Sequence, residues 1–261
     1  MLDVRDLTLG YGGAPVLAGF DLHVSPGSFV SLVGPSGSGK SSVLRAVTRL
    51  QPYESGSVRL DVDPESVGFL FQDDALLPWR TARENVALGL RIRGEAKGAA
   101  HARADVWLER LGLVGLSERY PRELSGGQRK RVAIAQVLAL GPRLLLMDEP
   151  FASLDAIVRH RLTADLLTWV ERERLTVLLV THDLEEALSL SDEVVLLGSG
   201  PRARVRRRFP VPLPRPRDLL AARTHPAFAP LLRQLWEELA QEVGGGDGAA
   251  WREPERQEVL S

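Results

Sequence analysis

Short apolar runs alternate with amphipathic stretches along most of the chain. Residues 29–33 (FVSLV), 144–147 (LLLM) and 177–181 (VLLVT) are almost wholly apolar, which is typical of short strands buried on both faces. Further strands are expected at 2–9, 16–24, 58–60, 67–71, 194–197 and 205–213, and helices at 43–50, 156–173, 184–190 and 227–243. Apolar strands separated by helices predict an α/β fold with a mostly parallel core sheet covered by helices on both faces.

The pattern changes twice within this α/β frame. The first two strands flank Gly12 and Gly13, which predicts an antiparallel β-subdomain at the N-terminal end. A helical period, broken by glycines and a proline, then runs from about residue 74 to 140, so we expect an inserted helical subdomain there. The expected organisation is a main domain over residues 1–215, a helical extension over 216–243 and a disordered tail over 244–261, which opens with GGGDGAA.

Composition narrows the class of protein. Hydrophobic residues make up 44% and charged residues 26% of the 261 positions, as in an ordinary globular protein. A formal net charge of −1 gives no global field for nucleic acid, and the absence of cysteine excludes disulfides and thiolate metal sites. No apolar run approaches the length of a membrane span and no signal peptide opens the chain, so we expect a soluble, cytoplasmic protein. The basic run 202–209 (RARVRRRF) indicates either a solvated edge strand or, less favourably, a lipid-headgroup or nucleic-acid patch.

The segment GPSGSGKSS, residues 34–42, directly follows the apolar strand 29–33 and precedes a helical stretch. It fits G-x-x-x-x-G-K-[ST], in which backbone N–H groups and a helix N-terminus surround a phosphate. Lys40 would bridge the β- and γ-phosphates and Ser41 would ligate Mg²⁺. The predicted nucleotide-binding residues here are Gly34, Pro35, Ser36, Gly37, Ser38, Gly39, Lys40, Ser41 and Ser42. The alternative is an ordinary Gly/Ser turn, which the flanking strand and helix disfavour.

A second candidate site lies where the strand 144–147 ends in Asp148 and Glu149. Ligands of open α/β sheets bind at the carboxyl ends of the strands, so both acids are expected at the phosphate loop. Asp148 would hold Mg²⁺ through water, and Glu149 is the candidate general base for an attacking water. A helix-capping acid followed by a turn is the alternative.

The segment LSGGQ (124–128), lying between these two motifs, identifies a family. In this order the motifs resemble those of the ATP-binding subunits of ABC transporters, over residues 2 to about 213. The resemblance implies an ABC cassette of the P-loop NTPase fold with ATP and Mg²⁺ as cofactors. It assigns Ser125, Gly126, Gly127 and Gln128 to the signature loop, which caps the ATP bound by a second copy of the chain in a dimer. A generic Ser N-cap is the alternative for this loop.

The resemblance also assigns single residues. Tyr11 matches the aromatic that stacks on adenine, and Gln72 matches the glutamine that senses Mg²⁺ and the attacking water. His182 matches the switch histidine, and residues 153–155 match the D-loop with its Asp155. The alternatives are that Tyr11 simply packs and that His182 is a satisfied surface or core residue. Gln136 departs from the family, which usually has arginine there, and this affects one local charge contact.

A transporter is favoured among ABC proteins because the insertion carries neither heptads nor cysteines and the chain holds one cassette. The implied partners are membrane permease subunits, a second copy and, indirectly, a solute-binding protein, with the chain peripheral on the cytoplasmic face of the membrane. Residues 73–90 would dock the permease, with Leu76, Leu77, Pro78 and Trp79 as an apolar socket or, alternatively, as subdomain core. ALLPW and VPLPRPRD are similar to importers of the nitrate, sulfonate and taurine group. A soluble ABC clamp on a macromolecule and an exporter remain the alternatives.

Overall fold

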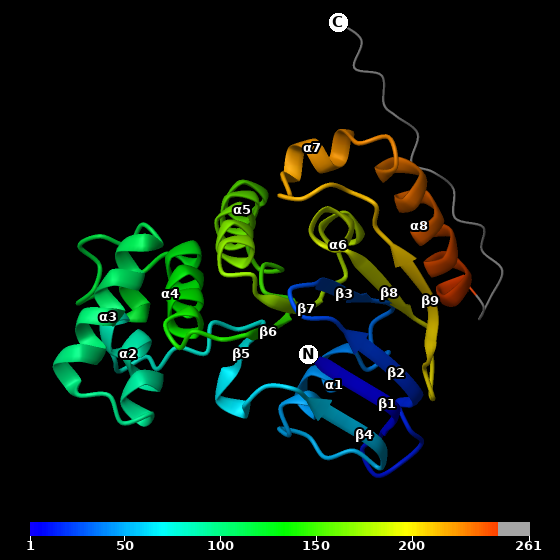
Figure 1. Ribbon diagram of the computed structural model, residues 1–261, viewed down its shortest axis with the longest axis horizontal. Coiled ribbons are helices and arrows are strands. Elements are labelled where there is room, and N and C mark those ends of the chain that lie inside the picture. Colours follow the sequence, from blue (N-terminus) through cyan, green and yellow to red (C-terminus); the bar gives the residue numbers. More distant parts are fainter. Residues whose placement is uncertain (245–261) are drawn as a thin grey trace, which may run out of the picture.

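A computed structural model describes residues 1–244 and shows two sheets with helices around them (Figure 1). The larger sheet has the strand order β5-β6-β7-β3-β8-β9, in which all pairs are parallel except β8 with β9. Its strands are β3 (Phe29–Val33), β5 (Val67–Leu70), β6 (Leu144–Asp148), β7 (Thr176–Val180), β8 (Glu193–Leu197) and β9 (Val205–Pro210). Three of them, β3, β6 and β7, are buried at every position, as their apolar sequences predict.

The smaller sheet is antiparallel, with order β2-β1-β4. Its strands are β1 (Leu2–Leu9), β2 (Leu17–Val24) and β4 (Ser55–Leu60). Helix α1 (Lys40–Val47) packs between this sheet and the larger one, and its Val43 and Leu44 join the same apolar cluster as Leu7 and Leu32. This layer confirms the predicted antiparallel β-subdomain and sets α1 under the carboxyl end of β3.

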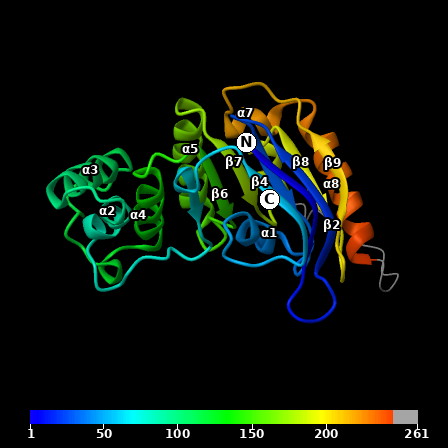
Figure 2. The same cartoon turned by 60° about the horizontal axis from the view of Figure 1, so that its bottom comes forward.

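The predicted helical insertion is present and projects from the sheets (Figure 2). It contains α2 (Ala82–Ile92), α3 (Lys97–Arg110) and α4 (Gly126–Leu138), with short 3-10 turns at Pro64–Ser66 before it and Pro121–Glu123 within it. Two of its helices begin with a capping box: Thr81 with Glu84 for α2, and Ser125 with Gln128 for α4. Helix α5 (Ala156–Arg172) shares an apolar core with the insertion and with one face of the larger sheet.

Further along the same face of the larger sheet lie α6 (Leu184–Leu190), α7 (Leu219–Thr224) and α8 (Phe228–Gly244), whereas α1 and the smaller sheet cover the opposite face. Strand β9 is an antiparallel edge strand, as predicted, but it ends at Pro210 rather than at 213. Three closely spaced prolines, at 210, 212 and 214, cannot donate to the ladder and end it there. The basic residues of β9 are ion-paired: Arg206 with Glu238 and Glu242, Arg207 with Glu238, and Arg208 with Glu193. Helix α8 therefore neutralises Arg206 and Arg207, two of the five arginines of the run 202–209.

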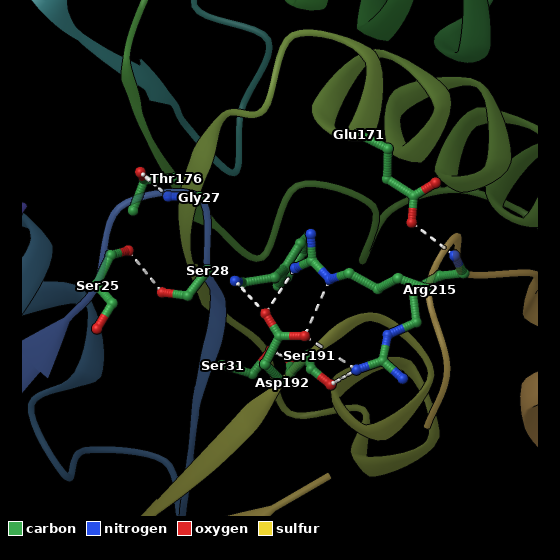
Figure 3. Close-up of polar contacts among 11 residues, drawn as sticks. Ser25, Gly27, Ser28, Ser31, Glu171, Thr176, Ser191, Asp192 and Arg215 are labelled. Atoms are coloured by element: carbon green, nitrogen blue, oxygen red, sulfur yellow. Dashed lines mark hydrogen bonds and ion pairs between the residues drawn. The ribbon is translucent and has the colours of Figure 1, made fainter. Parts of the chain in front are cut away.

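A polar cluster joins the C-terminal extension to the sheet at the starts of β3 and β8 (Figure 3). Asp192 accepts the backbone N–H of Phe29 at 2.9 Å and pairs with the guanidinium groups of Arg215 and Arg217. The backbone N–H of Arg217 donates to Glu171 of α5. These contacts join residues on both sides of position 215 to the same cluster. They therefore mark no division there, and the predicted boundary between a domain over 1–215 and an extension over 216–243 stays a prediction. The predicted disordered tail lies, apart from residue 244, outside the described residues.

Candidate functional site

A cavity of about 380 Å³ opens beside the loop between β3 and α1. It is lined by Tyr11, Val16, Ser36, Gly37, Gly39, Lys40, Ser41, Ser42 and Glu149. All of these except Val16 are residues that the motifs predicted. The cavity is polar at its floor and carries an aromatic ring at its rim, and its volume falls in the range typical of small-molecule sites.

The phosphate loop forms the floor because its glycines permit the turn into the helix. Gly39 precedes α1 at φ +90°, a left-handed conformation that favours glycine. Helix α1 then begins at Lys40 rather than at the predicted 43, so the motif itself supplies the first helical turn and its free N–H groups. The site thus has the helix-terminus anion geometry that the sequence predicted.

Lys40 brings a buried cation to this loop. Its Nζ donates to the carbonyl oxygens of Gly34 and Pro35, both at 2.8 Å. Burial lowers the pKa of Lys40, while the negative charges of Glu149 and Asp148 oppose that shift. The ammonium group is therefore poised to exchange backbone acceptors for phosphate oxygens.

Ser41 and Asp148 form a hard-oxygen pair beside Lys40. The Ser41 hydroxyl donates to Asp148 Oδ1 at 2.7 Å, which joins α1 to the end of β6. Burial raises the pKa of Asp148, and the neighbouring Glu149 adds to this, while the Ser41 hydrogen bond and the charges of Arg45 and Lys40 act the other way. A hydroxyl and a buried carboxylate are ligands that suit Mg²⁺, which keeps several waters and takes few protein oxygens. These residues fit the predicted metal.

Glu149 and His182 lie side by side at the ends of neighbouring strands. His182 Nδ1 is 2.8 Å from Glu149 Oε2, although 33 residues separate them in sequence. Strands β6 and β7 pair so that Asp148 lies opposite Val180, which places the residues that follow at one edge. Glu149 has φ +43°, a strained conformation for this residue of the kind that clusters at functional sites. Two of the three predicted catalytic groups, Glu149 and His182, are therefore brought together, and Gln72 is not.

Tyr11 is placed over the start of α1. Its hydroxyl is 2.7 Å from Ser42 Oγ and donates to Gln51 Oε1 at 3.0 Å, while the side chain is 64% exposed. An exposed ring with an anchored hydroxyl is available for stacking, and the stacking role of Tyr11 stays a prediction. Gln51 and Val16 were missed by the sequence analysis because neither belongs to a motif.

The remaining predicted residues are not brought to this cavity. Neither Gln72 nor any residue of the Ser125–Gln128 loop lines it, and α4 and α1 are well separated in both views (Figures 1 and 2). The Ser125 hydroxyl accepts the Gln128 N–H and Gln128 Oε1 accepts the Ser125 N–H, so within one chain the loop caps α4, and its role in a dimer stays a prediction. Asp155 likewise caps α5 by accepting the Val158 N–H at 3.0 Å.

Gly127 has a packing reason within this chain. A Cβ there would lie 2.8 Å from Cγ1 of Val158, so the Ser125 loop packs directly against the first turn of α5. This contact places the loop next to the D-loop residues 153–155.

Comparison with known proteins decides the family. A family model described as ABC transporter matches residues 17–152, slightly more than half of the chain. This chain belongs to the ABC transporter family. The cassette is 42% identical over 216 residues to the taurine import ATP-binding protein TauB of Escherichia coli strain K12, covering 81% of the chain and 84% of that protein. It is 44% identical over 240 residues to the aliphatic sulfonates import ATP-binding protein SsuB 2 of Nocardia farcinica, covering 92% and 96%.

Solved structures agree with this assignment. The dimeric structure of MJ0796, described as a bacterial ABC transporter cassette, matches with a TM-score of 0.72 at 31% identity and covers 81% of this chain and 99% of that one. A post-hydrolysis state of MJ0796 bound to ADP and Pi matches with a TM-score of 0.70. The predicted ABC cassette fold and the ATP-hydrolysing class of the chain are confirmed. No helix within residues 1–244 is long and apolar enough to cross a membrane.

Proposed function

We propose that the chain is the Mg²⁺-dependent ATPase subunit of an importer for a small organic anion of the taurine or sulfonate kind, or for nitrate. In this role two copies sit on the cytoplasmic face of the membrane and drive permease subunits that receive solute from a binding protein. The names of the relatives support import of taurine and aliphatic sulfonates. The observation that carries the proposal is the convergence of Lys40, Ser41, Asp148 and the Glu149–His182 pair at one edge of the sheet.

The roles of the residues follow from this geometry. Lys40 and the N–H groups at the start of α1 hold the phosphates, and Tyr11 stacks on the base. Mg²⁺ would be held by Ser41 and Asp148 and would neutralise phosphate charge, and Gln72, which does not line this cavity, would join as a ligand only on closure of two copies. Glu149 takes the proton of the attacking water, whose oxygen bonds to the γ-phosphorus as the bond to ADP breaks. His182 orients the Glu149 carboxylate through its 2.8 Å contact.

The proposed signature residues, Ser125 to Gln128, complete the site of a second copy. They lie away from this chain's own cavity, in a loop that caps α4 and packs on α5. A second anion-binding helix N-terminus has no phosphate to hold within one chain. Closure of two copies around two ATP molecules would use both sites, and hydrolysis would reopen them. Asp155 lies in the loop next to this contact.

The proposed permease contact is the segment after Gln72. Leu76 and Leu77 are half-buried, and Leu76 packs on the insertion core, whereas Pro78 is exposed and Trp79 is 70% exposed. The socket and core alternatives therefore each describe part of this segment. Large exposed aromatics such as Trp79 are common at the centres of protein interfaces.

The deciding experiment is gentle detergent extraction of the tagged chain from its own cells, with co-purifying proteins identified by mass spectrometry. Recovery of a multi-span permease at equal stoichiometry, together with a solute-binding protein, is the expected result. The ligand of that binding protein then names the solute. Recovery from the soluble fraction with nucleic acid or ribosomes would reject the importer in favour of a clamp. A permease whose vesicles move solute outward would reject it in favour of an exporter.

A further inference from the structure

Lys130 is a buried lysine that no motif explains. It lies on α4, five residues after Ser125, and only 1% of its surface is exposed. Burial of an ammonium group costs several kcal/mol unless charges and hydrogen bonds compensate it. The groups that compensate the buried charge of Lys130 therefore indicate its structural role.

All partners of Lys130 lie in one segment, residues 71–81, which we call the connector. Lys130 Nζ donates to the carbonyl oxygen of Gln72 at 2.9 Å and to that of Phe71 at 3.4 Å. It also pairs with Asp74 Oδ1 at 3.1 Å. The connector leads from β5 to α2 and carries the side chain of Gln72 and the exposed Trp79. Lys130 thus joins the backbone at Gln72 directly to the helix that begins at the Ser125 loop.

The connector is held in a defined shape around this contact. Arg129 Nε also donates to Asp74, at 3.3 Å, so two neighbouring cations of α4 clamp one carboxylate. The next residue, Ala75, has φ +52°, a left-handed conformation that a non-glycine residue adopts at a cost and keeps only where its surroundings enforce it. The Asp74 clamp supplies that constraint from the α4 side.

The far end of the connector is fixed by Asn85, which is fully buried on α2. Its Oδ1 accepts the Leu77 N–H at 2.8 Å, and its Nδ2 donates to the carbonyl oxygens of Leu77, Arg80 and Thr81. With both ends anchored, the connector cannot move by local bending alone. A displacement at Trp79 or at Gln72 must either break the Lys130 contacts or carry α4 with it.

We propose that Lys130 and Asp74 form a pin that makes the connector and the Ser125 loop move as one unit, so that both are positioning residues for ATP-driven closure. The inference rests on the proposed function, because it assumes that the Ser125 loop caps the nucleotide of a second copy. Without the pin, the loop must be ordered separately during closure. Binding of ATP to the single chain, which uses the Lys40 side of the cavity, does not involve the pin.

The test uses the full chain with Lys130→Met, which keeps the apolar stem and removes the charge, and Asp74→Asn, which keeps the size of the side chain. In the Glu149→Gln background we expect each change to raise the ATP concentration needed for half-maximal dimerisation about tenfold, within the usual range of coupling between sites. With Glu149 intact, kcat should fall by a similar factor. The affinity of the single chain for a fluorescent ATP analogue should stay within about twofold.

The matched control is Arg83→Met. Arg83 pairs with Asp105 at 2.7 Å inside the same insertion, and it touches neither the connector nor the Ser125 loop. Its loss should lower the melting temperature without moving the dimerisation threshold. The effect of the Lys130→Met/Asp74→Asn double variant should be clearly smaller than the sum of the two single effects, because both changes remove the Lys130–Asp74 contact.

Several results separate this inference from the proposed function. Unchanged thresholds in both single variants, additive effects in the double variant, or a threshold shift of the same size in Arg83→Met would each overturn the pin. If Lys130→Met does not fold, Asp74→Asn decides alone, since Lys130 keeps its two carbonyl acceptors in that variant. Two other results would instead overturn the proposed nucleotide site. One is failure of the unaltered chain to bind the ATP analogue, and the other is failure of the Glu149→Gln variant, with Lys130 and Asp74 intact, to dimerise with ATP.

Discussion

Two charged clusters lie at opposite ends of the same parallel strands, and they are built differently. At the amino ends, Asp192 accepts the Phe29 N–H and three guanidinium N–H groups from Arg215 and Arg217 (Figure 3). At the carboxyl ends, Asp148 accepts one hydrogen bond from Ser41, and burial raises its pKa. Asp192 therefore accepts four hydrogen bonds, whereas the buried Asp148 accepts one and can accept more.

This difference separates a cluster that holds the chain together from one that awaits a ligand. At the amino ends each charge has an opposite charge beside it, and the network fixes the extension against the sheet, although burial lowers the pKa of Arg217 and its Nε and Nη1 have no hydrogen-bond partner. Burial of the Asp148 carboxylate is costly to the free protein, and under the proposed function that cost would be recovered when Mg²⁺ and phosphate complete the cluster. Substitutions in the cluster at the carboxyl ends of the strands should therefore lower ATPase activity, whereas substitutions in the cluster at the amino ends should lower stability.

The largest expected effect is at Glu149. Glu149→Gln removes the proposed base, so kcat should fall at least about a hundredfold, the lower range for a positioned base. ATP binding and ATP-driven dimerisation should persist, because Lys40 and Ser41 are unaltered. Steady-state phosphate release and sedimentation with ATP measure the two effects. The control Glu185→Gln removes an exposed carboxylate of α6 and should leave turnover unaltered. Near-normal turnover in Glu149→Gln would remove Glu149 from the mechanism.

The next effect is on nucleotide affinity. Lys40→Ala removes the one ammonium group at the loop, and a hydrogen bond to a charged group contributes about 1.5–3 kcal/mol. We therefore expect MgATP to bind about 10–100-fold more weakly, measured by titration calorimetry, with no loss of thermal stability in the free protein. An exposed lysine, Lys97, replaced by alanine provides the control. Equal affinity in Lys40→Ala and the unaltered chain would contradict the phosphate-site assignment.

The sequence predicts the positions of residues that act within one chain better than the roles of residues that need a second copy. The structure brings the phosphate loop, Asp148, Glu149 and His182 to one edge, because strand ends in a parallel sheet meet there, and their roles stay predictions. The Ser125 loop has a local role as a cap and a proposed role that needs a second copy, so neither the sequence nor a single chain decides between them. Its Gly127 is explained by contact with Val158, which no local pattern reveals.

The fold was predictable where the pattern is local and less so where charges meet across long distances. The apolar runs predicted β3 and α6 to the residue, but α1 begins three residues early because the phosphate loop itself is helical there. In LSGGQRKR, Lys130 looks like part of a solvated basic run, yet it is buried by the connector 56 residues away. The basic β9 is paired with α8, which the composition of either segment alone does not indicate.

A smaller effect, on stability alone, is expected at Asp192, at the amino ends of the strands. Asp192→Asn leaves Arg217 buried without its carboxylate, which should lower the free energy of unfolding by about 2 kcal/mol. For a protein of this size that corresponds to a melting temperature about 4–8 °C lower. ATP turnover per folded molecule should stay within about twofold. Asp61→Asn, which breaks an exposed ion pair with Arg59, should change the melting temperature by far less. If Asp192→Asn lost turnover while its stability stayed unchanged, the cluster at the amino ends would serve activity rather than stability.

The smallest effect, and the one with the opposite sign, is expected at Asp148. Because burial raises the pKa of Asp148 in the folded chain, the folded state binds this proton more tightly than the unfolded state does. The carboxylate therefore costs stability at neutral pH, and that cost is lost as the pH falls through the raised pKa of the folded state towards the ordinary pKa of aspartate. Asp148→Asn keeps an oxygen acceptor for Ser41 and removes the charge, so the free protein should gain about 1 kcal/mol at pH 7, or about 2–4 °C. Thermal melts of both proteins from pH 7 downward should converge, while ATP hydrolysis by the variant is lost at every pH. A variant less stable than the unaltered chain at pH 7 would show that Asp148, like Asp192, is there to hold the fold.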